Sequence, residues 1–169
     1  MAKESNYANR INESDNFGGW KESEICAYCN GDLYNGLPAD LKAVIKTVNK
    51  LSDNGFDRSP YSWGGELVTT QDKIWIPSVT EIGVPPDPSD ITFAYVIIYA
   101  LAGQGPQYAV YTDDDSRIVN YDGSVQGDEY WLRSAYGDVN DGFCCIDIHD
   151  GYSCNYVGSE SCVVAGFCI

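Results

Sequence analysis

The chain has 169 residues, of which 44% are hydrophobic and 13% aromatic, and its formal net charge is −15. This apolar content is too high for a disordered chain, and the length is sufficient for one domain with its own hydrophobic core. The ten lysines and arginines are few and scattered, which argues against nucleic acids and anionic membrane surfaces as partners.

The sequence shows no signal for export or membrane insertion. No hydrophobic segment of a signal peptide follows Met1, and the longest apolar stretch, residues 93–102, is too short to span a bilayer. We therefore expect a soluble protein without a signal peptide and without membrane insertion. Seven cysteines cannot all pair with one another, and most are expected to be reduced thiols. They are Cys26, Cys29, Cys144, Cys145, Cys154, Cys162 and Cys168.

Two helices are predicted in the first third of the chain. Residues 1–17 form a polar N-terminal segment, and Gly18-Gly19 marks the entry into a single domain that we place at residues 18–169. Ser23 and Glu24 open a helix whose apolar residues recur at helical spacing, namely Ile25, Tyr28, Cys29 and Leu33. A second helix is predicted to begin at residues 37–40, with an apolar face formed by Leu41, Val44, Ile45 and Val48.

Cys26 and Cys29 have the CxxC spacing of redox pairs and of half a zinc site. A zinc site needs a second pair of ligands at comparable spacing, and none stands nearby. A cysteine on a helix face usually packs as a small hydrophobic residue. We therefore expect these two cysteines to be buried parts of the first helix.

Short strands separated by loops are predicted in the middle of the chain. Residues 54–65, 83–90 and 120–127 are expected to be loops because they are rich in Gly, Asp, Pro and Ser. Strands are expected at residues 68–70, 74–77, 108–111 and 117–119, and a helical turn at residues 78–82. Helices followed by many short strands indicate an α+β fold.

Two acidic loops contain carboxylates of the kind that calcium accepts as ligands, Asp87 with Asp90 and the run at residues 113–115. Carboxylates are also common in turns, and three consecutive ones cannot all face one ion in an extended chain. We therefore expect solvated loops and no bound metal or other cofactor.

The last forty residues combine two apolar ends with a polar middle. Tyr-Trp-Leu-Arg-Ser at 130–134 and the apolar run at 163–169 are expected to be scaffold, while residues 135–161 are rich in Gly, Asp, Tyr and Ser. The residues assigned to the core are Phe143, Ile146, Val163, Val164 and Phe167. The middle of this region is therefore predicted to form a recognition surface.

Several motifs along the chain support a family resemblance. They are GGW at 18–20, LPADLK at 37–42, KIWIPS at 73–78, YWLRS at 130–134 and GFCI at 166–169. Together they resemble bacterial and prophage domains of the DUF6273 type, which are similar to C-type-lectin-fold proteins, including the variable proteins of diversity-generating retroelements. The resemblance implies two helices packed on short, mostly antiparallel strands with long loops. Ala135 and Cys162 depart from the family, where Pro and Gly respectively are frequent.

The retroelement resemblance implies a codon pattern that the sequence can test. In such systems asparagine codons of the form AAC become NNC, and codons ending in C cannot encode Lys, Gln, Glu, Met or Trp. None of these five residue types occurs in the 26 residues from Ser134 to Ser159, whereas the other 143 positions contain 23 of them. This gap is the one expected of a diversified region.

The residue types in this region also suit recognition. Tyrosines supply rigid contact area, while Asp and Asn among glycines supply adaptable hydrogen bonding, as in antibody paratopes. Ordinary hairpin and loop residues would have the same composition. The predicted ligand-binding residues are Tyr136, Gly137, Asp138, Val139, Asn140, Asp141, Cys145, Ile148, His149, Tyr152, Asn155 and Tyr156.

Several alternatives remain open in the sequence. His149 is the one histidine, so a histidine-dependent acid-base mechanism would have to use it, with Cys145 or Cys154 as nucleophile, although no orienting motif accompanies it. The resemblance to the C-type lectin fold separately implies, as a further alternative, an enzyme related to formylglycine-generating enzymes, whose specific cysteine pair is not matched here. Cys144, Cys145, His149 and Cys154 are candidate zinc ligands, but adjacent cysteines in a strand point to opposite faces. A calcium-dependent glycan-binding lectin is the other alternative.

The prediction is therefore a binding module and not an enzyme. It implies an unknown protein or cell-surface ligand, no nucleic acid, and display on a virion or a bacterial surface. Homo-oligomerisation through other parts of the chain would raise avidity.

Overall fold

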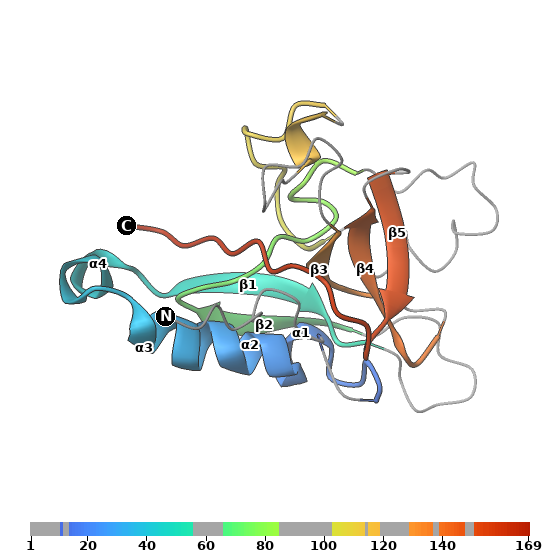
Figure 1. Ribbon diagram of the computed structural model, residues 1–169, viewed down its shortest axis with the longest axis horizontal. Coiled ribbons are helices and arrows are strands. Elements are labelled where there is room, and N and C mark those ends of the chain that lie inside the picture. Colours follow the sequence, from blue (N-terminus) through green and yellow to red (C-terminus); the bar gives the residue numbers. More distant parts are fainter. Residues whose placement is uncertain are drawn as a thin grey trace, which may run out of the picture.

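The computed structural model describes residues 11, 14–55, 66–84, 103–113, 115–118, 129–136, 139–147 and 151–169. The fold is α+β, as predicted: a run of short helices precedes two antiparallel sheets (Figure 1). One sheet has the order β1-β2 and the other the order β3-β4-β5. Within the part of the chain that is described, no helix is long and apolar enough to cross a membrane.

The predicted first helix is confirmed and is the longest helical run described. It comprises α2 (Glu24–Tyr28), a π-helical turn (Cys29–Leu33) and α3 (Tyr34–Gly36), and α1 (Gly19–Glu22) precedes it. Ser23 caps α2 because its hydroxyl oxygen accepts the backbone N–H of Cys26. Ile25, Cys26 and Cys29 are buried, so this helical face packs on the core.

The predicted second helix is shorter than its apolar pattern suggested. It is α4 (Ala39–Val44), and Ile45 already has an extended backbone. Val48 begins β1 (Val48–Asp53), a strand that the sequence did not reveal. The side chain of Val44 is 50% exposed whereas that of Ile45 is buried, so the predicted apolar face is buried only in part.

β1 pairs with β2 (Leu67–Asp72) in a regular antiparallel hairpin, from Val48↔Asp72 to Asp53↔Leu67. β2 confirms and extends the strand predicted at 68–70. Of the segment 74–77, Trp75 forms an isolated bridge with Gly166. The strand predicted at 108–111 is wrong, because a turn occupies these residues, and a 3-10 helix (Asp115–Arg117) replaces the start of the strand predicted at 117–119.

The second sheet contains β3 (Tyr130–Ala135), β4 (Gly142–Asp147) and β5 (Gly151–Tyr156). Each of its two faces packs against a separate hydrophobic cluster. Trp131, Phe143 and Cys145 pack with Trp20 and the α2 face, whereas Leu132 and Ile146 pack with residues of the 79–84 segment. All six residues of β3 are buried, which confirms that the YWLRS motif is scaffold.

Gly19 allows the start of the helical run to lie close against the β1-β2 hairpin. Gly19 has a φ of +54°, and a Cβ at this position would lie 1.9 Å from the carbonyl oxygen of Asp53. Only glycine fits such a backbone and such a close approach. Trp20 follows directly, and its indole N–H donates to Asp72 at 2.9 Å. The GGW motif therefore fixes the helices against the β1-β2 hairpin.

The structured domain begins before Gly18. Ile11 and Asn16 lie in the segment predicted as a polar N terminus, yet neither side chain is exposed to solvent. Ile11 packs in the same cluster as Trp20, and its carbonyl accepts the N–H of Ile25 at 3.4 Å. At least these residues of the N-terminal segment therefore belong to the folded unit.

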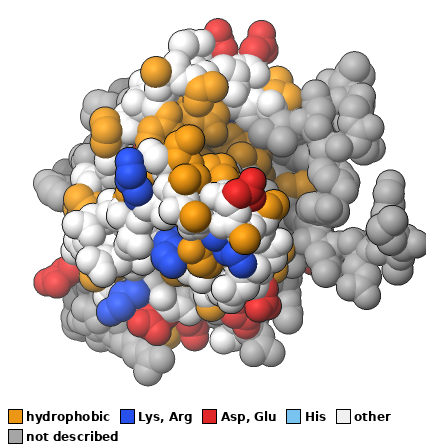
Figure 2. Space-filling view, turned by 90° about the vertical axis from the view of Figure 1, so that its left-hand side faces the viewer, with side chains coloured by type: hydrophobic (Ala, Val, Ile, Leu, Met, Phe, Trp, Pro, Cys, Tyr) orange, Lys and Arg blue, Asp and Glu red, His pale blue; other side chains and the backbone are white. Residues whose placement is uncertain are grey.

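The core assignments at the C terminus are confirmed in part. Phe143 and Ile146 are buried, and Val163 and Val164 pack half-buried against the two clusters. Phe167 was wrongly assigned to the core, because it is 45% exposed. It lies in a terminal segment in which Gly166 is bridged to Trp75 and Cys168 to Lys46. Hydrophobic side chains gather, with lysines or arginines among them, on the side of the molecule that carries α4 and the C terminus (Figure 2).

Some sequence predictions lie outside the described residues. They are the acidic residues Asp87, Asp90 and Asp114, the apolar stretch 93–102, residues 56–65 of the loop predicted at 54–65, and the whole loop predicted at 120–127.

Candidate functional site

The candidate site lies where β4 begins. Gly142 pairs directly with Tyr156 across the sheet, and directly paired residues project to the same face. A Cβ at Gly142 would lie 3.0 Å from Val139 Cγ2 and 3.3 Å from Tyr136 Cβ. The missing side chain of Gly142 therefore leaves room for Tyr136 and Val139 on the face to which Tyr156 projects.

We name Tyr136, Val139, Asn140, Asp141 and Tyr156 the Gly142 surface. Val139 is 40% exposed and Tyr156 51% exposed, and Asn140 is exposed as well. Asp141 is half-buried, and Tyr136 is buried with 9% of its surface accessible. An aromatic ring, an aliphatic side chain and an amide thus stand in solvent above a tyrosine that is held by the core.

Asn16 holds this surface in place from beneath. Its side-chain amide N–H group donates to the carbonyls of Tyr136, Val139 and Gly142 at 2.9, 2.8 and 2.8 Å. Its backbone N–H also donates to the carbonyl of Asn140 at 2.8 Å. One fully buried asparagine therefore satisfies carbonyls on both sides of the exposed turn.

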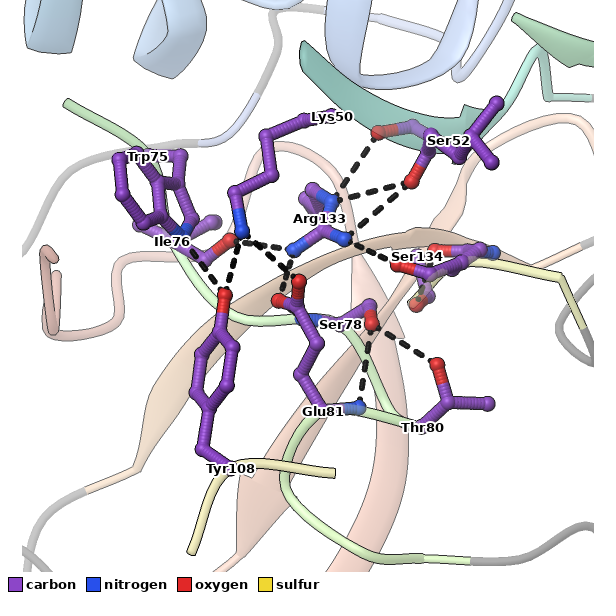
Figure 3. Close-up of polar contacts among 12 residues, drawn as sticks. Lys50, Ser52, Trp75, Ile76, Ser78, Thr80, Glu81, Tyr108, Arg133 and Ser134 are labelled. Atoms are coloured by element: carbon purple, nitrogen blue, oxygen red, sulfur yellow. Dashed lines mark hydrogen bonds and ion pairs between the residues drawn. The ribbon is translucent and has the colours of Figure 1, made fainter. Parts of the chain in front are cut away.

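Arg133 is the centre of a buried polar network behind β3 (Figure 3). Its guanidinium has no exposed surface and forms an ion pair with Glu81. It also donates to the carbonyls of Leu51, Ile76 and Gln104 at 3.2, 3.0 and 2.5 Å. The network therefore joins β3 to β1 and to two loop segments.

Lys50 completes the network from the outer side. Its ammonium lies 2.9 Å from Glu81 Oε1, donates to the hydroxyl of Tyr108 at 2.5 Å, and sits 4.1 Å from the centre of the Trp75 ring. The indole N–H of Trp75 donates to the same Tyr108 hydroxyl at 2.9 Å. The position is filled by the protein's own cation, so we assign the network a structural role.

The network predicts a loss of stability in acid. Burial by itself would raise the pKa of Glu81, but the hydrogen bond and charge of Arg133, with Tyr108 and Lys50, outweigh it and lower this pKa. The ionised form is thus favoured by folding, and its contribution is complete above the unfolded-state pKa of about 4.3 and is lost as the pH falls through the lower folded-state value.

We therefore expect the free energy of unfolding to fall below about pH 4. Urea unfolding between about pH 3 and pH 7 measures this dependence, because that range covers the titration of a glutamate. Glu81→Gln should flatten the profile, whereas Glu160→Gln, which removes a carboxylate from an exposed position, should leave it unchanged. Equal profiles for all three proteins would contradict the assignment.

The other predicted ligand-binding residues are placed less favourably. Cys145 is 1% exposed and packs in the core with Trp131, so it is not part of the exposed surface. Asn155 is half-buried, donates to Glu129 at 2.9 Å and accepts the hydroxyl of Ser159 at 3.0 Å. The backbone of Tyr152 pairs with Ile146, and its side chain lies outside the described part. Gly137, Asp138, Ile148 and His149 also lie outside it.

The cysteines behave as packing residues at the positions named for chemistry. All seven are thiols. Burial, with the neighbouring charge of Asp72, raises the pKa of Cys26 to about 12, and burial likewise raises the pKa of Cys29 to about 12. Burial and then Glu129 raise the pKa of Cys145. Cys144 and Cys145 pack in different clusters on opposite faces of the sheet, so one metal ion cannot be held by both.

Two supporting residues were missed in the sequence. Asn16 gave no signal, because a single asparagine in a polar segment is indistinguishable from a solvated one. Arg133 did give one: a charged residue within an otherwise apolar strand is buried only with partners, and this predicts a carboxylate nearby. That carboxylate is Glu81, which the sequence analysis did not single out.

The chain matches no curated protein and no solved structure. A family model described as a domain of unknown function, DUF6273, matches residues 1–169. The match includes the N-terminal residues Ile11 and Asn16, which the structure buries. The chain therefore belongs to the DUF6273 family over its whole length.

Proposed function

We propose that the chain is a ligand-binding variable protein of a diversity-generating retroelement. In this proposal a C-type-lectin-like fold displays a diversified C-terminal surface, within residues 135–161, to a protein or cell-surface ligand. The observation that carries the proposal is the Gly142 surface, where exposed side chains stand on a backbone that the buried Asn16 side chain holds by three hydrogen bonds.

The division between fixed and exchangeable residues supports the proposal. The hydrophobic core contains Trp20, Trp75 and Trp131, and the Arg133 network contains Lys50 and Glu81. NNC codons cannot encode any of these residue types. The Gly142 surface contains residue types that such codons do encode. Exchange at Val139, Asn140 and Tyr156 removes mainly solvent-exposed groups, which changes stability little.

The composition of the surface supports binding rather than catalysis. Tyr156 and Val139 offer apolar contact area beside the amide of Asn140, the combination found in binding loops. Cys145, one of the two nucleophiles considered for an enzyme, is buried, and its raised pKa keeps it protonated at neutral pH. We therefore propose a recognition domain that acts on a virion or bacterial surface.

Binding should depend on Tyr156. An exposed tyrosine in a binding surface is a typical hot spot, so Tyr156→Ser is expected to weaken binding at least tenfold, about 1.4 kcal/mol or more. The labelled protein is titrated on a panel of intact bacterial cells and on a glycan array, with and without a calcium chelator. Val44→Ser is the matched control, because Val44 is 50% exposed and lies on α4, away from β5 (Figure 1).

Each outcome decides between functions. Loss of binding in Tyr156→Ser alone supports recognition by the Gly142 surface. Glycan binding that is abolished by the chelator and unchanged in Tyr156→Ser favours a calcium-dependent lectin. Equal loss in Tyr156→Ser and Val44→Ser contradicts the proposed surface.

A further inference from the structure

Two cysteines face each other across the β4-β5 hairpin. Cys144 in β4 and Cys154 in β5 are direct partners in the antiparallel register. Both belong to the cluster on the same face of the sheet, Cys144 fully buried and Cys154 half-buried at its border. The pair lies within the region that presents the Gly142 surface.

The hydrogen-bond alternation shows which type of pair they form. The N–H of Val157 donates to the carbonyl of Asp141 at 2.9 Å, and this pair continues the register of β4 and β5 by one position. Hydrogen-bonded and non-hydrogen-bonded pairs alternate along an antiparallel ladder. Cys144 and Cys154 are three positions further on, so they form a non-hydrogen-bonded pair.

That geometry suits a disulfide. Residues in a non-hydrogen-bonded pair have Cα atoms about 4.5 Å apart and side chains closer than in the other pair type. Disulfides span Cα separations of about 4.4–6.8 Å. No rearrangement of the backbone is therefore needed to bring the two sulfur atoms together.

The other cysteines near this face are out of reach. Cys145 packs on the opposite face of the sheet. Cys162 bridges Tyr130 on the outer side of β3, so β3 separates it from β4 by two strand spacings, about 9–10 Å in all. Cys26 and Cys29 lie in the helical run, where burial and a raised pKa make their thiols slow to react.

We propose that Cys144 and Cys154 form a reversible cross-strand disulfide when the domain meets an oxidising disulfide compound. The proposal does not depend on the identity of the ligand or on the retroelement. The half-buried thiol of Cys154, as thiolate, attacks one sulfur of the oxidant, which forms a mixed disulfide and releases one thiol. The Cys144 thiolate then attacks the Cys154 sulfur and displaces the second thiol.

Atoms and electrons balance in this exchange. The two protein thiols lose two protons and two electrons in total, and the oxidant is reduced to two thiols. The new bond closes the β4-β5 hairpin above the 147–151 connection, so it restrains separation of the two strands in the unfolded state. It would thus make the presenting hairpin more resistant to unfolding outside the cell than in a reducing cytosol.

The test uses the full chain and oxidised glutathione. After incubation, unreacted thiols are alkylated under denaturing conditions, and intact mass and peptide mapping identify the linked cysteines. We expect five alkylated cysteines, a mass two hydrogen atoms below that of the chain carrying five alkyl groups, a Cys144–Cys154 peptide, and a higher Tm that dithiothreitol reverses. Cys154→Ser and Cys144→Ala should both abolish the link, while Cys162→Ser, a half-buried cysteine at the same cluster, should not.

Circular dichroism of the reduced proteins shows whether a variant lost the disulfide because it misfolded. A variant that retains the wild-type spectrum is folded, and the conservative Cys154→Ser change is chosen for this reason. A link between Cys26 and Cys29, a link that persists in Cys154→Ser, or glutathione that stays attached to Cys154 in the wild type would each overturn the proposal.

Discussion

Arg133→Met is expected to lower the free energy of unfolding by about 3–5 kcal/mol, because it leaves the buried carboxylate of Glu81 without its closest cation. The carbonyls of Leu51, Ile76 and Gln104 lose their donor in the same substitution. A domain of this size has a total stability of about 5–15 kcal/mol. The variant should therefore be marginally stable or unfolded at about 37 °C.

Urea or thermal unfolding followed by circular dichroism measures this effect. Lys42→Met is the control, because Lys42 is a surface cation whose ammonium donates to one carbonyl, that of Asn35 at 2.9 Å. Loss of such a contact changes stability by about 0.5 kcal/mol or less. A wild-type unfolding curve for Arg133→Met would show that the network does not hold β3 to its neighbours.

Asn16→Ala is expected to destabilise the protein by about 2–3 kcal/mol and to loosen the Gly142 surface in particular. The side chain of Asn16 donates to three carbonyls, and its bonds to those of Tyr136 and Gly142, at 2.9 and 2.8 Å, are buried. Without the amide, the turn at residues 139–141 must find other donors. Ligand contact by this turn should weaken even at temperatures where the domain remains folded.

Amide hydrogen exchange distinguishes local from global effects of Asn16→Ala. Protection should fall first at residues 139–142 and at Val157, whose N–H donates to Asp141 within the same turn. Asn35→Ala provides the comparison, because Asn35 is exposed on α3. Uniform loss of protection across the sheets, or none, would contradict a specific role in supporting the surface.

The sequence predicted best where one period dominated. The helical spacing of Ile25 and Cys29, strengthened by the Ser23 cap, identified the first helix, and the YWLRS motif identified β3 as scaffold. It failed at residues 44–48, because Val44 and Val48 fit a helical face and Val48 also starts a strand. Between them, Lys46 pairs with Cys168 near the C terminus, a long-range contact that no local sequence pattern contains.

Exposure within residues 135–161 could be predicted for some side chains but not for each of them. Composition indicated that residues 135–161 include exposed tyrosines and amides, and Tyr156 and Asn140 are exposed. The burial of Cys145 could not be predicted, because both faces of β4 are covered, one by the α2 cluster and one by the 79–84 segment, so alternation along the strand does not mark an exposed side. Phe167 was misjudged for the opposite reason, since the terminal segment is covered only in part.

Sequencing of the genomic DNA around the coding region tests most directly whether the Gly142 surface is exchanged from copy to copy. We expect a reverse-transcriptase gene nearby and a near-copy of the codons for residues 130–169. This template should carry adenines at positions that specify Val139, Asn140 and Tyr156, and should match the gene at Trp131 and Arg133. Absence of both the reverse transcriptase and the near-copy, or differences concentrated at the buried positions, would contradict exchange at the Gly142 surface.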